Sequence, residues 1–504
     1  MLVVLLLLLL AQAAATAARH VFFIKAPTSP AAPPINFTWL QQSPTSFSAD
    51  SFRNAMDSLH KGNATENLAS SIRVGLTYQW EMLDCFLSPH TCTTSQTVEG
   101  ITNFLNAAKE TRTPVQITLD TVQFWYSSNL WNWFDATQPG YDQNNIHNVE
   151  WTGWTPENAT TIAWRNWGSQ FRMPTPQPNL ASPQLLEKLS VVLTTVIGAI
   201  REWHDAQTPD VRQLLVDIKL GEEVDVGANF YFYPSGNQLR TQDPSHDPKY
   251  GPKWAEGLSG GLPAQGYNLV RTLGLRTSGG PPTRDEITQG VQHYFATLVK
   301  ACRAAWPGLA TTGGLRAGSV ALPPTLSLHA GLVGDPLLIK WTAAMVGGAI
   351  PGYSAYPGVG EKIGQPGLAT ALQSYDPDAR RFVVAESTCF GCQNAQEWLS
   401  YFDSIFNNPY GSAQYVRIYN IQPFIAAGGA LDALATLTNS TRPANSCFSV
   451  DPCGGCWCPV KQGSTQSHFC CNEPCAAENI TCGCGCACHS NCIPSTPGNT
   501  SAAY

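Results

Sequence analysis

Charged residues are scarce in this chain: Asp, Glu, Lys and Arg make up 13% of its 504 residues, whereas 43% are hydrophobic. So apolar a composition excludes a disordered chain, because it can bury a large core. Basic residues are also in deficit, since 29 Lys and Arg stand against 36 Asp and Glu, a formal net charge of −7. This balance argues against nucleic acid or an anionic membrane as a general partner.

Motifs for several other chemistries are missing. The sequence has no His-Glu-x-x-His pair and no phosphate-binding glycine loop, which disfavours metalloproteases and P-loop enzymes. His and Asp do not cluster at the ends of the predicted strands, so we expect no metal ion. We expect no cofactor.

The strongest apolar run lies at the N-terminus. Residues 2–10 are all Leu or Val, and mostly small residues follow. This pattern is typical of a secretory signal peptide and is short for a membrane span. We expect a signal peptide over 1–18, no membrane span in the mature chain, and a secreted protein or one in the lumen of a secretory compartment. Six Asn-x-Ser/Thr sequons agree with that route: Asn36, Asn63, Asn158, Asn439, Asn479 and Asn499.

Cysteine is concentrated at the other end. Twelve of the 17 cysteines lie between Cys447 and Cys492, after a predicted linker at 439–446. In the cytosol this spacing would suggest a thiolate metal site, but after a signal peptide it favours a module held together by disulfides. We expect the module over 447–492, with a cell wall or matrix as its partner, and a tail over 493–504.

The five remaining cysteines predict two disulfides and one free thiol. Cys85 and Cys92 predict a loop disulfide, and Cys389 and Cys392 predict a structural disulfide after the strand at 381–387. Because 17 is odd, at least one thiol lacks an intrachain partner. We expect that thiol to be Cys302, buried on a helix.

Strands and helices alternate over residues 19–438, which favours an α/β fold, a (β/α)8 TIM barrel with long loops on the catalytic face. Helix starts are predicted at Ser182-Pro183, at Thr283 with Glu286, and at Asn394 with Glu397. A further helix is predicted over 341–348. The eight candidate strands are 20–25, 72–78, 115–120, 214–223, 309–312, 349–353, 381–387 and 415–420.

Two of these strands end in carboxylates. By the period-2 rule, Val216, Ile218 and Leu220 share one face of strand 214–223 with Glu222, whereas Glu223 lies on the opposite face, toward the barrel mouth. The strand at 381–387 carries Glu386 near its end. Two such glutamates can serve as acid and nucleophile for glycosidic cleavage. Two alternatives stay open: one or both glutamates form rim salt bridges, or a bulge at the strand end inverts Glu222 and Glu223.

Long loops at 123–181 and 226–282 are rich in Trp, Asn and Tyr, which stack on sugar rings or bond their hydroxyls. We expect most of the Trp rings to form a small core and only two or three to reach substrate. Asp217 and Lys219 lie deeper in the barrel, where we expect them to neutralise each other. The predicted substrate-binding residues are Asp120, Trp125, Arg165, Trp167, Asn229, Tyr353 and Tyr419.

Glutamates after the fourth and seventh strands resemble the arrangement of retaining glycoside hydrolases of clan A, which include the β-galactosidases of family 42. The resemblance implies that Glu223 is the acid/base and Glu386 the nucleophile. Members of the clan commonly have Asn-Glu at the fourth strand, whereas this chain has Glu222-Glu223. The Cys-rich module lies outside the resemblance.

The sequence therefore predicts a secreted retaining glycosidase that acts on an oligo- or polysaccharide. The alternative is a secreted carbohydrate-binding or matrix protein on a catalytically inactive barrel. Convergence of Glu223 and Glu386 in one pocket would favour the enzyme.

Overall fold

The structure is a computed structural model. It describes residues 20–25, 37–39, 47–70, 72–83, 93–121, 130–161, 163–166, 170–173, 176–224, 226, 230–231, 265–309, 324–332, 340–354, 366–408, 410–419, 421–439, 456–462, 465–470 and 493–494.

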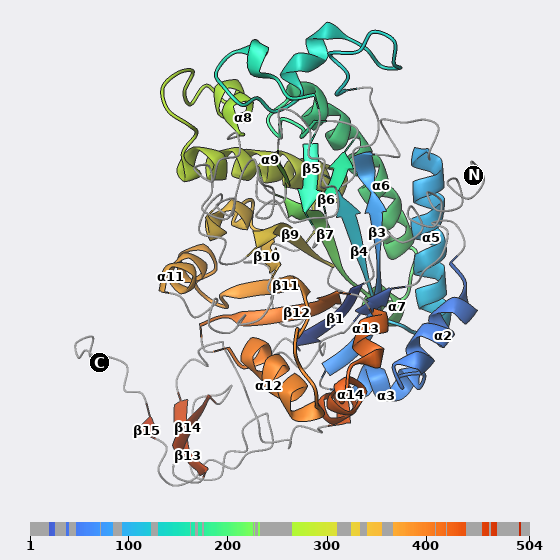
Figure 1. Cartoon of the computed structure of the whole chain (residues 1–504). Helices are drawn as coiled ribbons and strands as arrows, with labels where there is room; N and C mark the ends of the chain where they lie inside the picture. The colour runs from blue at the N-terminus through green and yellow to red at the C-terminus, as the bar shows by residue number, and fades with distance from the viewer. Residues whose placement is uncertain are drawn as a thin grey trace.

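Parallel strands form a curled sheet at the centre of the molecule (Figure 1). Each strand pairs with the next in the order β3 (Ile72–Glu81), β4 (Val115–Asp120), β7 (Leu215–Val224), β9 (Thr325–Leu332), β10 (Ile350–Ser354), β11 (Arg381–Ser387) and β12 (Ser412–Tyr419). The short strand β2 (Phe37–Trp39) pairs parallel with β3. β1 (His20–Lys25) pairs antiparallel with both β12 and β3 and closes the ring.

Helices surround this sheet (Figure 1). Before β9 lie α2 (Ala49–Ser58), α3 (Ala64–Ala69), α5 (Thr94–Thr111), α6 (Pro183–Asp205), α7 (Pro209–Arg212), α8 (Tyr267–Thr272) and α9 (Arg284–Ala305). After β9 lie the 3-10 helix η5 (Trp341–Ala344), α11 (Pro366–Tyr375), α12 (Ala395–Phe406), α13 (Ile421–Ala426) and α14 (Ala430–Asn439).

The predicted helix starts at Ser182, Thr283 and Asn394 are confirmed, because each side chain accepts a hydrogen bond from a backbone N–H in the first turn of α6, α9 or α12.

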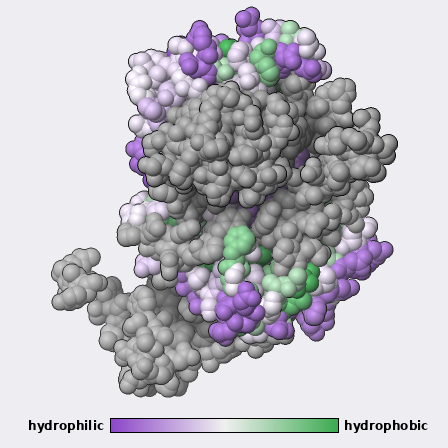
Figure 2. Space-filling view, viewed as in Figure 1, coloured by the Kyte–Doolittle hydropathy of each residue, from purple (hydrophilic) through white to green (hydrophobic). Residues whose placement is uncertain are grey.

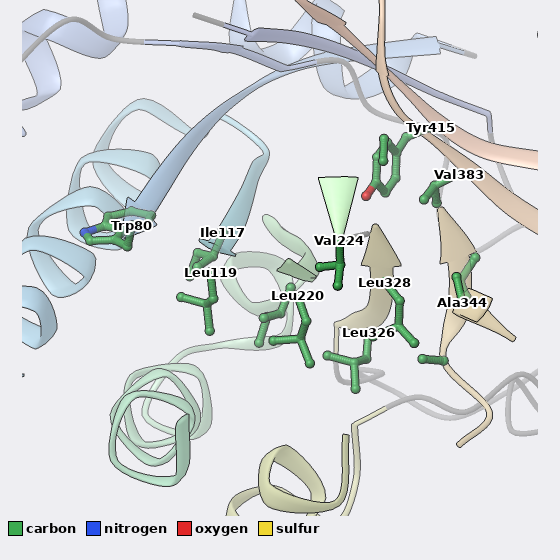
Figure 3. Packing of buried hydrophobic residues seen from close by; sticks show 14 of the residues in the cluster. Trp80, Ile117, Leu119, Leu220, Val224, Leu326, Leu328, Ala344, Val383 and Tyr415 are labelled. Atoms are coloured by element: carbon green, nitrogen blue, oxygen red, sulfur yellow. The ribbon is translucent and has the colours of Figure 1, made fainter. Parts of the chain in front are cut away.

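Alternation along the strands sorts apolar from polar side chains. Leu119, Leu220 and Leu326 extend from β4, β7 and β9 toward the helical layer (Figure 3), and all three are buried. The intervening residues fill the interior of the ring with polar groups. Asp217 on β7 accepts hydrogen bonds from Gln116 Nε2 at 2.9 Å and from Ser327 Oγ at 2.7 Å.

Helix α6 packs beside α9 in the helical layer. Among the residues that the structure describes, α6 is the one helix long and apolar enough to cross a membrane, judged by length and composition. Its Leu189, Leu193 and Ile197 belong to the hydrophobic core.

The segment 130–161 forms a loop-rich layer after β4. Trp131 and Trp151 are buried in it, which confirms for these two rings that they form core. Two 3-10 helices, η1 (Gln143–His147) and η2 (Pro156–Asn158), lie in this segment. Its outer surface is mostly hydrophilic, at the top of the view in Figure 2. A separate antiparallel sheet joins β5 (Ala163–Asn166), β6 (Gln170–Met173) and β8 (Phe230–Tyr231).

Three of the predicted elements differ from the structure. The predicted fifth strand covers residues 309–312. Leu309 lies in a bend instead of a strand, so the prediction is wrong there, and residues 310–312 lie outside the described residues. The strand that pairs between β7 and β10 is Thr325–Leu332. The predicted first strand, 20–25, runs antiparallel to its neighbours. The helix predicted over 341–348 is only the 3-10 turn η5, because Gly347 and Gly348 both have positive φ.

Other predictions fall outside the described residues: the signal peptide, residues 440–446 of the linker, the Cys85–Cys92 disulfide and the pairing of the cysteines of the Cys-rich module. Asn439, where the linker was predicted to begin, is instead the last residue of α14. In the C-terminal region, β14 (Thr465–Cys470) and β15 (Ile493–Pro494) each pair antiparallel with the central strand β13 (Cys456–Gln462).

Candidate active site

Three glutamates lie at the carboxyl ends of β7 and β11, and all three are buried. Glu222, Glu223 and Glu386 expose 1%, 4% and 7% of their surface. Counted along the parallel pairings from β2, β7 is the fourth strand and β11 the seventh. This end of a curled parallel sheet is where barrel enzymes carry their catalytic groups.

A bulge at the end of β7 brings both adjacent glutamates inside. The pairing of β7 with β9 shifts register between Leu220 and Val224. Gly221 has φ +79° and Glu223 has φ 48°, both in the left-handed region. Glu222 contacts Lys219 in the interior, so the predicted helix-facing position of Glu222 is wrong. Four steps along β7, from Leu220 to Val224, stand against two along β9, from Leu328 to Ala330, and the two extra residues break the local alternation on which that prediction relied.

Glu222 is the centre of an ion cluster. Its Oε2 accepts hydrogen bonds from Arg417 Nη1 at 2.5 Å and from Lys219 Nζ. Both cations are fully buried. Although burial opposes its ionisation, Arg417 and Lys219 hold the pKa of Glu222 well below its usual range. Lys219 thus pairs with Glu222, not with Asp217 as predicted.

Asp120 joins the same network from β4. Arg417 Nη2 donates to Gln79 Oε1 at 3.1 Å, and Gln79 Nε2 donates to Asp120 Oδ2 at 2.9 Å. Asp120 is buried. Its carboxylate therefore orients Gln79, which in turn orients the guanidinium that holds Glu222.

Glu223 has a different set of neighbours. Ser354, at the end of β10, donates to Glu223 Oε1 at 2.8 Å. The same hydroxyl lies 2.7 Å from His329 Nε2, and His329 Nδ1 lies 3.2 Å from Lys219 Nζ. Burial, with Lys219 next in importance, lowers the pKa of His329 to about 3, so the ring is neutral at physiological pH. Burial and the nearby Arg417 lower the pKa of Lys219 to about 8.

Glu386 completes the group of carboxyls. It faces Ser354 across the pairing of β10 with β11. Burial, and then the negative charges of Glu223 and Glu222, raise its pKa well above the usual range. The three glutamates therefore lie close enough for electrostatic coupling, and the negative charges of Glu223 and Glu222 oppose the ionisation of Glu386.

Of the predicted substrate-binding residues, only Asp120 has a described side chain in this network. Tyr353 is buried, and its hydroxyl donates to the carbonyl of Trp341 in η5 at 2.7 Å, away from the glutamates. Arg165 lies on β5 and Tyr419 ends β12, and only their backbones are described. Trp125, Trp167 and Asn229 lie outside the described residues.

Sequence reasoning missed several residues of this centre: Gln79, His329, Ser354 and Arg417. A signal for His329 was present, because Thr325-Leu326-Ser327-Leu328-His329 alternates polar and apolar residues like an inward-facing strand. No comparable local signal marks Ser354 or Arg417, whose roles depend on contacts across the ring.

A disulfide closes a short loop in the segment after Glu386. Cys389 and Cys392 form a disulfide, and Ser387 shares a short hydrogen bond with Tyr401 of α12. The structural disulfide predicted here is confirmed. So is Cys302 as a buried free thiol, and burial raises its pKa to about 12.

Within the part of the chain that the structure describes, no group of three or more His, Cys, Asp or Glu side chains is placed to hold a metal ion.

No family model and no curated protein sequence matches the chain. Several solved structures have a similar fold. GH5_18 from Streptomyces cattleya in complex with GlcNAc is 12% identical, with a TM-score of 0.39, over 81% of each chain. The catalytic domain of β-amylase from Paenibacillus polymyxa is 8% identical, with a TM-score of 0.42, over 81% of this chain and 98% of that one. The exo-β-1,4-mannosidase Op5Man5 from Opitutaceae bacterium strain TAV5 is 10% identical, with a TM-score of 0.34, over 75% of this chain and 50% of that one. At these identities and scores the likeness decides neither family nor activity.

Proposed function

We propose that the protein is a glycoside hydrolase that cleaves O-glycosidic bonds of an oligo- or polysaccharide with Glu223 and Glu386. The observation that carries the proposal is the convergence of these two carboxyls inside the ring. Ser354 faces Glu386 across the strand pairing and donates to Glu223, and the charge of Glu223 raises the pKa of Glu386. Two carboxyls that compete for one proton provide the acid and the ionised partner that glycoside cleavage needs.

The position of the proton bears on the role of each glutamate. We assign the proton of the free protein to Glu386, because burial and the neighbouring negative charges raise the pKa of that carboxyl, whereas the hydrogen bond from Ser354 favours the carboxylate form of Glu223. On this distribution Glu386 protonates the leaving oxygen, and Glu223 attacks the anomeric carbon or activates water. The resemblance to clan A implies the reverse roles. Leaving-group dependence separates the two assignments.

We further propose that the reaction retains configuration, which requires carboxyl groups about 5–5.5 Å apart instead of about 6.5–9.5 Å. This part of the proposal follows from the resemblance to the retaining enzymes of clan A. In the corresponding (β/α)8 barrel, β2 would count as the first strand and β1 as an added antiparallel strand.

The proposed setting is outside the cell. The apolar N-terminal run and the sequons support secretion, and Asn63 and Asn158 are exposed, as glycan attachment requires. We propose that residues 447–492 form a disulfide-held module that binds a cell wall or matrix.

The test is a screen of aryl glycosides and polysaccharides with the full-length secreted protein, with Glu386→Gln as the matched inactive variant. Product anomers are followed by NMR from the first turnover. Cleavage that is lost in the variant, with the retained anomer formed first, supports the proposal. Binding of a polysaccharide by both proteins, without turnover by either, would replace it with the carbohydrate-binding alternative.

A further inference from the structure

The side chain of Ser354 stands between an imidazole and a carboxylate. Its Oγ donates to Glu223 Oε1 at 2.8 Å and lies 2.7 Å from His329 Nε2. A hydroxyl has one proton to donate. Because Ser354 gives that proton to Glu223, its oxygen accepts from His329, and Nε2 of the imidazole carries a hydrogen.

The other nitrogen of the ring leads to the same tautomer. Lys219 Nζ lies 3.2 Å from His329 Nδ1, and an ammonium group has donors only. Nδ1 therefore accepts from Lys219 and is unprotonated. Glu222 Oε1 also lies 3.3 Å from Nδ1. In a neutral ring whose Nε2 carries the hydrogen, Nδ1 has no proton to give to this carboxylate, and Lys219 is the donor to Nδ1. A neutral ring of this kind fits a group that is completely buried.

From these contacts we propose that His329 and Ser354 are positioning residues that hold Glu223 as an inward-pointing carboxylate, with His329 fixed as the Nε2–H tautomer. The inference rests on the proposed function, because it concerns one of the two glutamates of the proposed reaction. The charged and titratable groups around the chain of hydrogen bonds are Lys219 and Glu222 on β7, Glu386 on β11 and Arg417 on β12.

Glu223 needs such support for a backbone reason. Its φ of 48° lies in the left-handed region, which non-glycine residues adopt only when their surroundings enforce it. The hydrogen bond from Ser354 fixes the carboxylate at the end of this strained turn. It also favours the ionised form over the protonated form.

The kinetic test compares Ser354→Ala with Ser354→Thr, which keeps a hydroxyl, and with Ser327→Ala. Ser327 is a matched control, because it is a buried serine of the same interior, bonded to Asp217 instead of a glutamate of the site. For Ser354→Ala we expect kcat to fall about 10- to 100-fold with little change in KM, as for other lost orienting contacts.

The pH profile supplies a signature that lost packing would not give. In Ser354→Ala, the apparent pKa of the acidic limb of the kcat/KM profile should rise by about one pH unit, because the carboxylate of Glu223 loses a hydrogen-bond donor. Ser354→Thr should restore the limb, and Ser327→Ala should leave it unmoved. An unmoved limb in Ser354→Ala, or an equal shift in Ser327→Ala, overturns the inference.

A second measurement does not depend on activity. In protein labelled with ¹⁵N-histidine, and with His329→Gln to assign the signal, the His329 ring should show Nε2–H and should not titrate near pH 6.5. An Nδ1–H ring or titration near pH 6.5 overturns the inference even if glycosides are cleaved. The expected tautomer together with a complete lack of glycosidase activity supports the inference about Glu223 and rejects only the proposed function.

Discussion

Arg417, on the last strand of the ring, donates a 2.5 Å hydrogen bond to Glu222 on β7, 195 residues away in sequence. Both side chains are fully buried, and Lys219 shares the same carboxylate oxygen. Glu222 is therefore a counter-ion for two buried cations, a role different from that of its neighbour Glu223.

We expect Glu222→Ala to destabilise the protein by about 3–5 kcal/mol, since two buried cations then lose their partner. Denaturant unfolding measures this loss. Glu222→Gln, which keeps an acceptor oxygen, should cost less than the alanine variant. Wild-type stability in Glu222→Ala would contradict the assigned role.

Glu386→Gln should remove turnover by about three orders of magnitude or more while the fold is preserved, because the amide can neither donate an acidic proton nor attack. Steady-state kinetics measures the loss of turnover, and circular dichroism checks that the fold is preserved. Near-normal activity in this variant would dismiss Glu386 as a catalytic residue.

Alanine variants at the two catalytic positions distinguish their roles. The variant of the acid should keep more activity on aryl glycosides with activated leaving groups than on those with poor ones, since the former need little protonation. The proposed assignment of the proton to Glu386 predicts this behaviour for Glu386→Ala, whereas the clan A roles predict it for Glu223→Ala.

Added azide supplies the complementary test. In a retaining enzyme, azide should rescue the acid/base variant to give a glycosyl azide of retained configuration, and the nucleophile variant to give one of inverted configuration. Rescue of Glu222→Ala, with neither other variant responding, would reassign the site.

Glu150 gives a prediction about stability against pH. It is buried, and its Oε2 accepts from the Gly266 N–H at 2.9 Å. Burial raises its pKa from 4.5 to about 8. Between these values the folded protein binds more protons than the unfolded chain, so this group's contribution to stability is complete below pH 4.5 and is lost as pH rises to about 8.

Glu150→Gln should therefore flatten the dependence of unfolding free energy on pH, and above pH 8 it should be more stable than wild type by up to about 5 kcal/mol. Thermal or denaturant unfolding from pH 5 to 9 measures this. Glu157→Gln, at an exposed carboxyl of η2, is the control and should retain the wild-type slope. Parallel slopes in all three proteins would exclude a raised pKa at Glu150.

Truncation after residue 446 should leave catalysis intact, because the composition changes at the linker and so small a module needs disulfides to fold by itself. Turnover on a small aryl glycoside measures this, whereas binding to an insoluble polysaccharide should fall. One equivalent of zinc per purified secreted protein, lost on truncation, would contradict the disulfide prediction.

Local sequence signals predicted much of the scaffold. The caps at Ser182, Thr283 and Asn394 depend on residues within one turn, so the starts of α6, α9 and α12 were readable. The carboxylates of β7 and β11 were also found, because strands that end in charge are conspicuous in an apolar chain.

Long-range contacts were not readable in this way. The antiparallel direction of β1 depends on partners at both edges of the sheet, β12 and β3. Arg417 and Ser354 have functional neighbours only after the ring closes. For the fifth strand, a weak apolar stretch at 309–312 was preferred to the true alternation that begins at Thr325.

A single glycine accounts for the division of tasks between two consecutive residues. At Gly221, with φ +79°, an added Cβ would lie 2.5 Å from Val224 Cγ2, so any other side chain would strain or displace the turn. Without this turn, a regular strand would present only one of its two final carboxylates to the interior. With it, one glutamate neutralises the buried cations and the next is left for chemistry. A mutation at a residue with no functional group would thus alter the electrostatic balance and the reactivity of the site together.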